Sequence, residues 1–357
     1  MPDLSCKYTA VLAELLYFCG MKTATDKTAF PIDAVITWVD GADPEHRQKR
    51  DHYRKLAGIP TAAVPTTQYN QIGELAFVLR SIIQFAPFVR HIYIVTDAQI
   101  PPIIATLNAE NPVNKSRIMV VDHQEIFAKF PNVLPTFNSL TIESVLQQIK
   151  GLADHFIYFN DDMFLIKPTK STDWFEGSKP VLRGAWYLQP QGVWYKRLKA
   201  FFFPKSLQRP SFRRAQAQAA QLVGYSTHYF RGYHSPRPLL KSQLISYFDD
   251  HKELLNNQIA HRFRHPSQFT PYTLFNHWMI RQNAAVLKDA RALVEIHNPQ
   301  RKSLSKIKQF LEKAAANPSV FMLNLQSLDL VDSSKLAYIT QWLTTHITQQ
   351  SFPSHDA

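Results

Sequence analysis

The sequence predicts an α/β fold built on a mostly parallel sheet, and two patterns in its first half carry that prediction. Short runs rich in valine, isoleucine and tyrosine alternate with stretches whose apolar residues recur at helical spacing. Strands that are apolar throughout are typical of parallel sheets covered by helices on both faces. With 357 residues, 45% of them hydrophobic, the chain can bury a large core.

The expected elements follow one another regularly from residue 31. Four strands are expected, over residues 32–39, 91–97, 117–123 and 155–159. Helices are expected over residues 72–87, which end at a proline, and 138–151, which end at a glycine. Strands and helices in this order predict a Rossmann-like, mostly parallel core.

The composition changes beyond Glu176. The basic, aromatic and proline-marked stretch of about 177–230 has no clean period and is interpreted as an insertion or lid, with a short helix at RRAQAQAAQLV. Amphipathic helices are expected at the C-terminal end, in residues 301–357. Residues 1–30 are expected to form an N-terminal helical segment, because their apolar run is interrupted by Glu14 and is too short to span a bilayer. The catalytic domain would then occupy residues 31–300.

The net charge of +12 is concentrated in one stretch of the chain. No aspartate or glutamate lies between Glu176 and Asp249. The cations in this stretch are Lys179, Arg183, Lys196, Arg197, Lys199, Lys205, Arg209, Arg213, Arg214, Arg231, Arg237 and Lys241. Such a field attracts polyanions, although a solvated basic face is the alternative interpretation.

Several common functional signatures are missing from the sequence. The chain has only two cysteines, Cys6 and Cys19, which provide no disulfide framework and indicate a reducing compartment. It has no GxxxxGK[ST], no clear GxGxxG and no GxSxG. P-loop, dinucleotide-binding and hydrolase interpretations therefore lack support.

Acidic residues mark the ends of all four expected strands, at Asp40, Asp97, Asp122 and Asp161. Parallel strands place their carboxyl ends at one edge of the sheet, where ligands bind in open α/β folds. Aspartate is also a good turn residue, which would explain one or two of the four. Together with Asp162, the set favours a site for Mg²⁺ or Mn²⁺, which prefer oxygen ligands.

Two basic segments and one glutamate add candidate catalytic groups. RGYHSPRPLLK contains His234, an imidazole able to act as a general acid or base, although a solvated loop histidine is the alternative. HRFRHPSQF contains Arg262 and Arg264, whose guanidinium groups suit phosphate. Glu143 lies off the apolar stripe of its expected helix, near the predicted crevice.

Taken together, the blocks IDAVITWVDG, ELAFVLRSI, FAPFVRHIYIVTDAQIP, VVDHQEIF, LPTFNS, IES, IKGLADHFIYFNDDMFL, HSPRPLLK and RFRHPSQF resemble the Stealth family. These are hexose-1-phosphate transferases of bacterial capsule synthesis, related to the lysosomal-enzyme GlcNAc-1-phosphotransferase. The resemblance covers roughly residues 31–280. It implies transfer of a hexose-1-phosphate, with GlcNAc-1-phosphate as the expected group, from a UDP-sugar to a hydroxyl of a growing capsular polysaccharide. Phosphodiester links would form and UMP would leave.

The resemblance also implies roles for particular residues. The implied catalytic residues are Glu143, Asp162, His234 and Arg264, the metal ligands Asp33 and Asp161, and the cofactor-binding residues Arg80, Asn138 and Asn160. The chain departs from many members before its Glu74-Leu75 pair, where Gln68, Asn70 and Gln71 stand.

The expected partners are a UDP-sugar, an anionic polysaccharide acceptor, an anionic membrane surface and other capsule-synthesis proteins, and not nucleic acid. The expected location is cytoplasmic, at the inner face of the inner membrane. Two alternatives stay open. One is a metal-dependent glycosyltransferase that releases UDP, and the other is a polyanion-binding module without catalysis, supported by the basic stretch and its interleaved aromatic residues.

Overall fold

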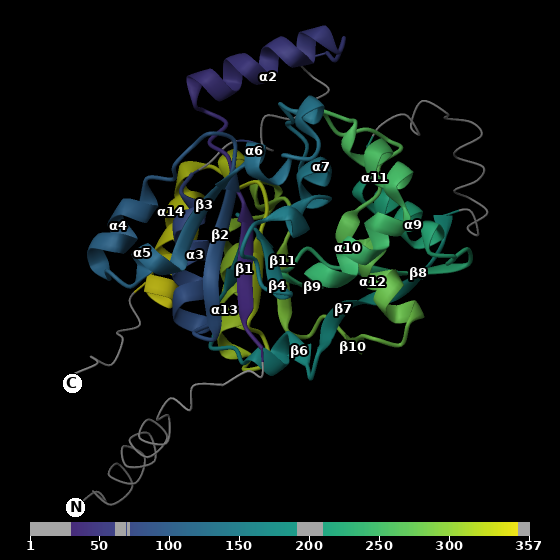
Figure 1. The fold of residues 1–357 in the computed structure, drawn as a ribbon. Coiled ribbons are helices and arrows are strands. Elements are labelled where there is room, and N and C mark those ends of the chain that lie inside the picture. Colours follow the sequence, from purple (N-terminus) through teal and green to yellow (C-terminus); the bar gives the residue numbers. More distant parts are fainter. Residues whose placement is uncertain (1–29, 61–68, 70–71, 191–209, 349–357) are drawn as a thin grey trace, which may run out of the picture.

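The main sheet of the protein is mostly parallel, as the sequence predicts. The computed structural model describes residues 30–60, 69, 72–190 and 210–348. The five strands lie in the order β3 (Ile118–Asp122), β2 (Val89–Thr96), β1 (Ile32–Thr37), β4 (His155–Asn160) and β9 (Arg237–Leu240). The first four are parallel, and β9 is antiparallel to β4. Figure 1 shows this sheet at the centre of the molecule with helices on both sides.

Helix α3 (Glu74–Phe85) confirms the helix expected over residues 72–87. Its apolar residues recur at three- and four-residue spacing, so one face is continuous and buried against the sheet. The other helices of the main domain are α2 (Pro44–Leu56), α4 (Ile103–Glu110), α5 (Asn114–Arg117), α6 (His123–Ile126), α7 (Ser139–Glu143), α10 (Lys241–Asp250), α11 (Lys252–Ile259) and α12 (Pro271–Arg281).

The helix expected over residues 138–151 is much shorter than predicted. It consists of α7 and a separate 3-10 turn over Leu146–Gln148. The hydroxyl of Ser144 donates to the backbone carbonyl of Leu140 at 2.7 Å, and the side-chain amide of Gln147 donates to the backbone carbonyl of Ser144 at 2.9 Å. These side chains compete with the helical backbone bonds and end the helix after one turn.

The stretch of about 177–230 is not an irregular insertion, which corrects the prediction for its described part. It contains β7 (Lys179–Leu188) and β8 (His228–Gly232), which pair antiparallel, while β6 (Phe175–Glu176) and β10 (Val286–Lys288) also pair with β7. The predicted short helix is confirmed as α9 (Phe212–Leu222). Half-exposed aromatic residues, rather than a clean apolar alternation, hid the strands from the sequence pattern. Residues 191–209, with five of the twelve cations, lie outside the described residues.

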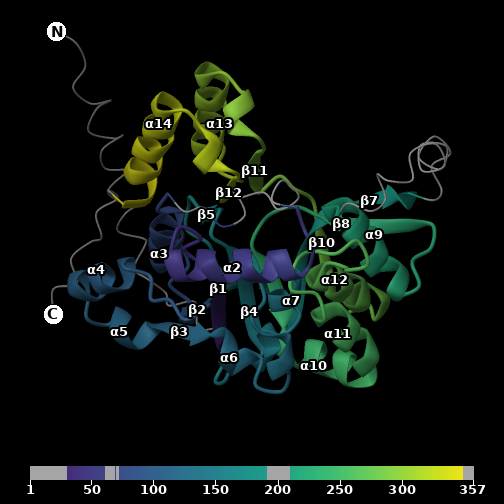
Figure 2. The ribbon, with the colours of Figure 1, turned by 90° about the horizontal axis from the view of Figure 1, so that it is seen from above.

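The C-terminal part contains strands as well as the predicted helices. Helices α13 (Leu304–Ala316) and α14 (Ser333–Leu343) are confirmed. Between and before them, β12 (Met322–Leu325) pairs with β11 (Leu293–Ile296) and with β5 (Met163–Leu165). In Figure 2 these elements lie on one side of the molecule and α10, α11 and α12 on the other. The predicted helix over 1–30 falls almost wholly outside the described residues, and no helix in the described part is long and apolar enough to cross a membrane.

Buried histidines make the stability of this fold dependent on pH. Burial lowers the pKa of His123 and of His277 to about 4. Between pH 6.5 and 4 the unfolded chain therefore binds more protons, so stability falls as the pH is lowered through this window. We expect a loss on the order of 2 kcal/mol per histidine between pH 7 and 5, measured by urea unfolding. His123→Gln should reduce this dependence to the part contributed by His277, and a slope equal to that of wild type would contradict the prediction.

Candidate active site

The carboxyl ends of the four parallel strands meet at one edge of the sheet, but their aspartates do not form one cation site. Asp122 caps α6 and accepts from the backbone N–H of Gln124 at 2.8 Å. Asp97 pairs with Lys49 at 2.7 Å, and Asp40 accepts from the backbone of Ala42 at 2.9 Å. In the described part of the chain, no three His, Cys, Asp or Glu side chains are placed to hold a metal. The turn-residue interpretation fits Asp40 and Asp122, whereas Asp97 forms an ion pair.

The expected role of Asp33 as a metal ligand is wrong. Asp33 is the second residue of β1, so it lies at the amino end of the sheet, opposite the predicted crevice. Its carboxylate is fully buried and accepts from Arg90 Nε at 2.9 Å and Nη2 at 2.7 Å, and from the backbone of Ala153 at 2.7 Å. Asp33 therefore ties β1 to its neighbours.

Arg80 is also not a cofactor-binding residue in this structure. It lies on α3 and makes a two-pronged ion pair with Glu110 of α4, at 2.7 and 2.6 Å. Neither cavity described below includes it among its lining residues. The family resemblance could not show that Arg80 lies on the outer face of its helix.

Asn138 holds two parts of the site together and also lines the smaller cavity described below. It caps α7 by accepting from Leu140 at 3.2 Å, and its Nδ2 donates to the carbonyl of His261 and to Gln268 Oε1, both at 2.9 Å. This fixes the start of α7, which carries Glu143, against the loop that carries Arg264. Asn138 is thus a positioning residue.

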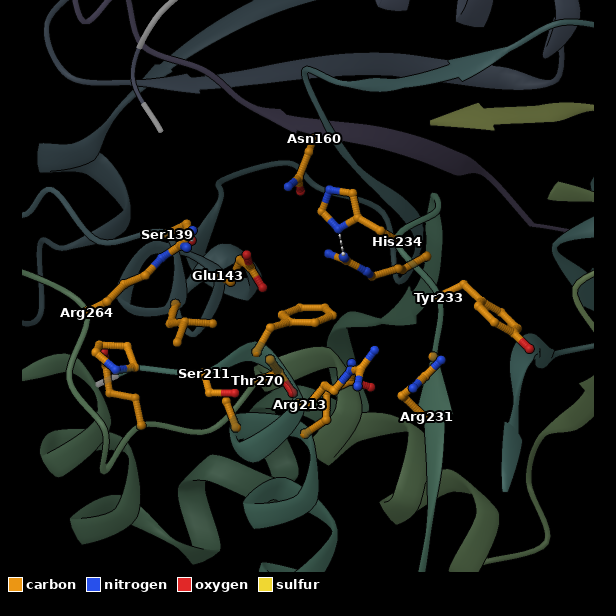
Figure 3. A pocket seen from close by; sticks show the side chains of 18 of the residues that line it. Ser139, Glu143, Asn160, Ser211, Arg213, Arg231, Tyr233, His234, Arg264 and Thr270 are labelled. Atoms are coloured by element: carbon orange, nitrogen blue, oxygen red, sulfur yellow. Dashed lines mark hydrogen bonds between the residues drawn. The ribbon is translucent and has the colours of Figure 1, made fainter. Parts of the chain in front are cut away.

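The main cavity brings three of the four predicted catalytic residues together. It has a volume of about 380 Å³, and its lining includes Glu143, His234 and Arg264 with Asn160 at the end of β4. Figure 3 shows Glu143 between Arg264 and His234, with Arg213 and Arg231 on the far wall. Arg264 donates to the hydroxyl of Ser139, the first residue of α7, at 2.9 Å. Residues more than 120 positions apart in sequence therefore share one pocket.

The fourth predicted residue, Asp162, contacts His234 directly. His234 Nε2 lies 3.1 and 3.0 Å from the two carboxylate oxygens of Asp162. Arg237 Nη2 lies 3.4 Å from His234 Nδ1, and since arginine can only donate, Nδ1 is the acceptor. The neutral ring then carries its proton on Nε2 and directs the lone pair of Nδ1 away from the aspartate.

The two carboxyl groups of the site have opposite electrostatic environments. Burial raises the pKa of Glu143, and Arg237 and Arg264 offset this effect only in part. Burial would also raise the pKa of Asp162, but the charge and hydrogen bond of His234 outweigh it and lower that pKa. Asp162 is therefore suited to stay ionised beside an imidazolium, whereas burial favours the protonated form of Glu143.

Sequence reasoning missed three residues that complete the site. From β11, Glu295 accepts from the backbone N–H of His234 at 2.8 Å. From β12, the amide of Asn324 donates to the carbonyl of Asp162 at 2.9 Å. Arg237 lies in the HSPRPLLK block, but the sequence pattern assigned it no catalytic or binding role. No local pattern marks Glu295 or Asn324, because their partners lie 61 and 162 positions away.

A second, smaller cavity adjoins the first at the sheet edge. It has a volume of about 120 Å³, shares Ser139, Asn160 and Arg264 with the main cavity, and includes Asp161. The side-chain oxygen of Asn160 is buried and accepts no hydrogen bond from the protein. An orphaned amide oxygen next to a carboxylate fits Mg²⁺, which takes oxygen ligands, keeps several waters and is usually shared with phosphates.

The sequence matches two family models, both of the Stealth proteins. Conserved region 1 matches residues 30–56 and conserved region 2 matches residues 68–181. The capsular polysaccharide phosphotransferase fcs1 of Haemophilus influenzae is 34% identical over 274 residues, which cover 74% of this chain and 71% of that protein. The chain belongs to the Stealth family.

The chain is also similar to other polysaccharide phosphotransferases. The capsular polysaccharide phosphotransferase WcwK of Streptococcus pneumoniae is 30% identical, with 70% of this chain and 78% of that protein covered. The exopolysaccharide phosphotransferase SCO6023 of Streptomyces coelicolor is 34% identical over 76% of this chain, which spans 44% of that longer protein. Among solved structures, the galactosyltransferase LgtC aligns with a TM-score of 0.45 and 11% identity, covering 90% of this chain and 98% of that chain.

Proposed function

We propose that this Stealth protein is a polysaccharide phosphotransferase that moves a hexose-1-phosphate from a UDP-sugar to a hydroxyl of a capsular polysaccharide. The observation that carries the proposal is the pocket in which the His234–Asp162 pair faces Glu143 and Arg264. The names of the relatives support the reaction class. GlcNAc-1-phosphate is the transferred group we favour.

The proposed reaction needs one proton acceptor and neutralisation of charge on phosphorus. When Arg237 donates to the phosphoryl group instead of to His234 Nδ1, the acceptor hydroxyl gives its proton to Nδ1 as its oxygen forms a bond to the sugar-bearing phosphorus, and the bond from that phosphorus to the UMP oxygen breaks. Asp162 stabilises the imidazolium that forms, in the manner of the aspartate of a catalytic triad. Arg264 is placed to stabilise charge on the phosphoryl oxygens.

Asn160 and Asp161 are the residues we propose to hold Mg²⁺ or Mn²⁺ when it is bound. The ion would neutralise the diphosphate of the donor. The lining of the smaller cavity also includes the aromatic residues Trp38, Tyr69 and Phe137. This lining suits the uracil ring of a UDP-sugar.

The cations on the wall of the main cavity suit an anionic acceptor. Arg213 is exposed, and Arg231 stacks on the ring of Tyr187 with its guanidinium carbon 4.1 Å from the ring centroid. A phosphodiester polymer carries a negative charge at each linkage, so these side chains can hold the growing chain. We further propose a cytoplasmic location at the inner face of the inner membrane, near other capsule-synthesis proteins.

The product distinguishes this function from that of a conventional glycosyltransferase. With UDP-sugars labelled in the phosphate next to the sugar, Mg²⁺ and capsule oligosaccharides, we expect the label to enter the polymer and UMP to be released. Unlabelled polymer with UDP released would replace the proposal by sugar transfer. Binding of the anionic polymer without turnover of any UDP-sugar would favour a polyanion-binding module.

A further inference from the structure

Arg237 is an arginine buried in the wall of the active-site cavity. It is the first residue of β9, where it pairs in register with Tyr158 of β4. Only 6% of its surface is exposed, and its guanidinium carbon lies 3.8 Å from the centroid of the Tyr272 ring. This stacking fixes the plane of the guanidinium beside the 380 Å³ cavity.

The hydrogen bonds of this buried cation are incomplete. Its Nη2 approaches His234 Nδ1 at 3.4 Å, but Nε and Nη1 are buried and have no hydrogen-bond partner. Among the described residues, no carboxylate lies within ion-pairing distance of Arg237. Buried cations in folded proteins are normally paired, because an unpaired charge in the interior is costly. The cavity wall therefore holds a positive charge with free donors, which acts on the carboxyls of Glu143 and Asp162 without a direct hydrogen bond to either.

The charges around the cavity indicate what that anion is. Arg237 and Arg264 both act on the buried carboxyl of Glu143, so two guanidinium groups lie near the same point of the cavity. His234, which Arg237 contacts, is the group we assign to deprotonate the acceptor hydroxyl. A group bound by both arginines would lie next to that base. A phosphoryl group matches this arrangement, since it offers several oxygens to separate N–H donors.

We propose that Arg237 binds the phosphoryl group that is transferred and, through its contact with Nδ1, positions His234 beside it. The identity of the bound group as the transferred phosphoryl rests on the proposed function, whereas the anion site itself rests only on the geometry of Arg237. When the phosphoryl oxygens take the donors of Arg237, the lone pair of Nδ1 is released beside the phosphorus to be attacked and can accept the proton of the hydroxyl.

Inorganic phosphate is a direct probe of this site. We would measure its binding to the full chain by calorimetry and by the rise in melting temperature, for wild type, Arg237→Met, Arg237→Lys and the control Arg291→Met. Arg291 has the same charge, but its side chain is 86% exposed. We expect phosphate to bind at least tenfold more weakly to both Arg237 variants and with unchanged affinity to Arg291→Met. Arg237→Met should also be no less stable than wild type without phosphate, because it removes an unpaired buried charge.

Phosphate affinity within twofold of wild type in Arg237→Met would overturn the assignment. If that variant does not fold, Arg237→Lys decides by the same criterion, since it keeps the charge. Failure of the anion site is distinguishable from failure of the function. If wild type releases UMP but the variants bind phosphate as well as wild type does, the anion site at Arg237 is wrong and the proposed reaction stands. If wild type releases UDP and the variants bind phosphate more weakly, the anion site stands and the proposed reaction is wrong.

Discussion

Asp162→Asn should reduce UMP release by about 10⁴-fold while leaving the fold intact. An asparagine at this position can donate to His234 Nε2, which places the ring proton on Nδ1 and removes the lone pair that accepts the proton of the hydroxyl. The backbone carbonyl at this position would keep its bonds from Asn324 and Leu325, so the loop should stay in place. Turnover of the labelled UDP-sugar and NMR of the histidine tautomer would measure the effect.

The matched control is Asp154→Asn, at the other end of the same strand. Asp154 lies just before β4, next to His155, with its carboxylate 3.9 Å from the imidazole. It thus offers a similar Asp–His pair outside the cavity, and its replacement should change turnover less than twofold. Equal activity of Asp162→Asn and wild type would show that the His234–Asp162 pair takes no part in the reaction.

Asp33→Ala should destabilise the protein by about 3 kcal/mol without any specific effect on metal dependence. The substitution leaves Arg90 and the backbone N–H of Ala153 without their acceptor at the amino end of the sheet. The buried N–H of Ala153 is left without an acceptor, whereas Arg90, which is 40% exposed, keeps water and the carbonyl of Gly151. Urea unfolding at pH 7 gives the stability, and a Mg²⁺ titration of turnover gives the metal requirement.

The comparison is Asp51→Ala, which removes a half-exposed ion pair with Arg54 on α2. That pair should be worth less than about 1 kcal/mol. A large increase in the Mg²⁺ requirement of Asp33→Ala, with stability close to that of Asp51→Ala, would restore Asp33 as a metal ligand and contradict the structural role given to it here.

The site shows where sequence reasoning reaches its limit. Asp162, His234 and Glu143 were predicted as catalytic from their blocks, and the structure places them around one cavity. The blocks could not show that Asp33 faces the opposite end of the sheet or that Arg80 pairs with Glu110. A motif gives the residue type, but the partner of a charged side chain depends on packing.

By itself, the sequence determined the four parallel strands, helix α3, the helices α9, α13 and α14, and the family. These features follow from local apolar periodicity and from blocks of neighbouring residues. Only the tertiary structure decided which charges meet. Arg90 reaches Asp33 across 57 positions, Glu295 reaches His234 across 61, and Asn324 reaches Asp162 across 162. Such contacts are set by how strands and loops pack in three dimensions, which no local pattern of residues encodes.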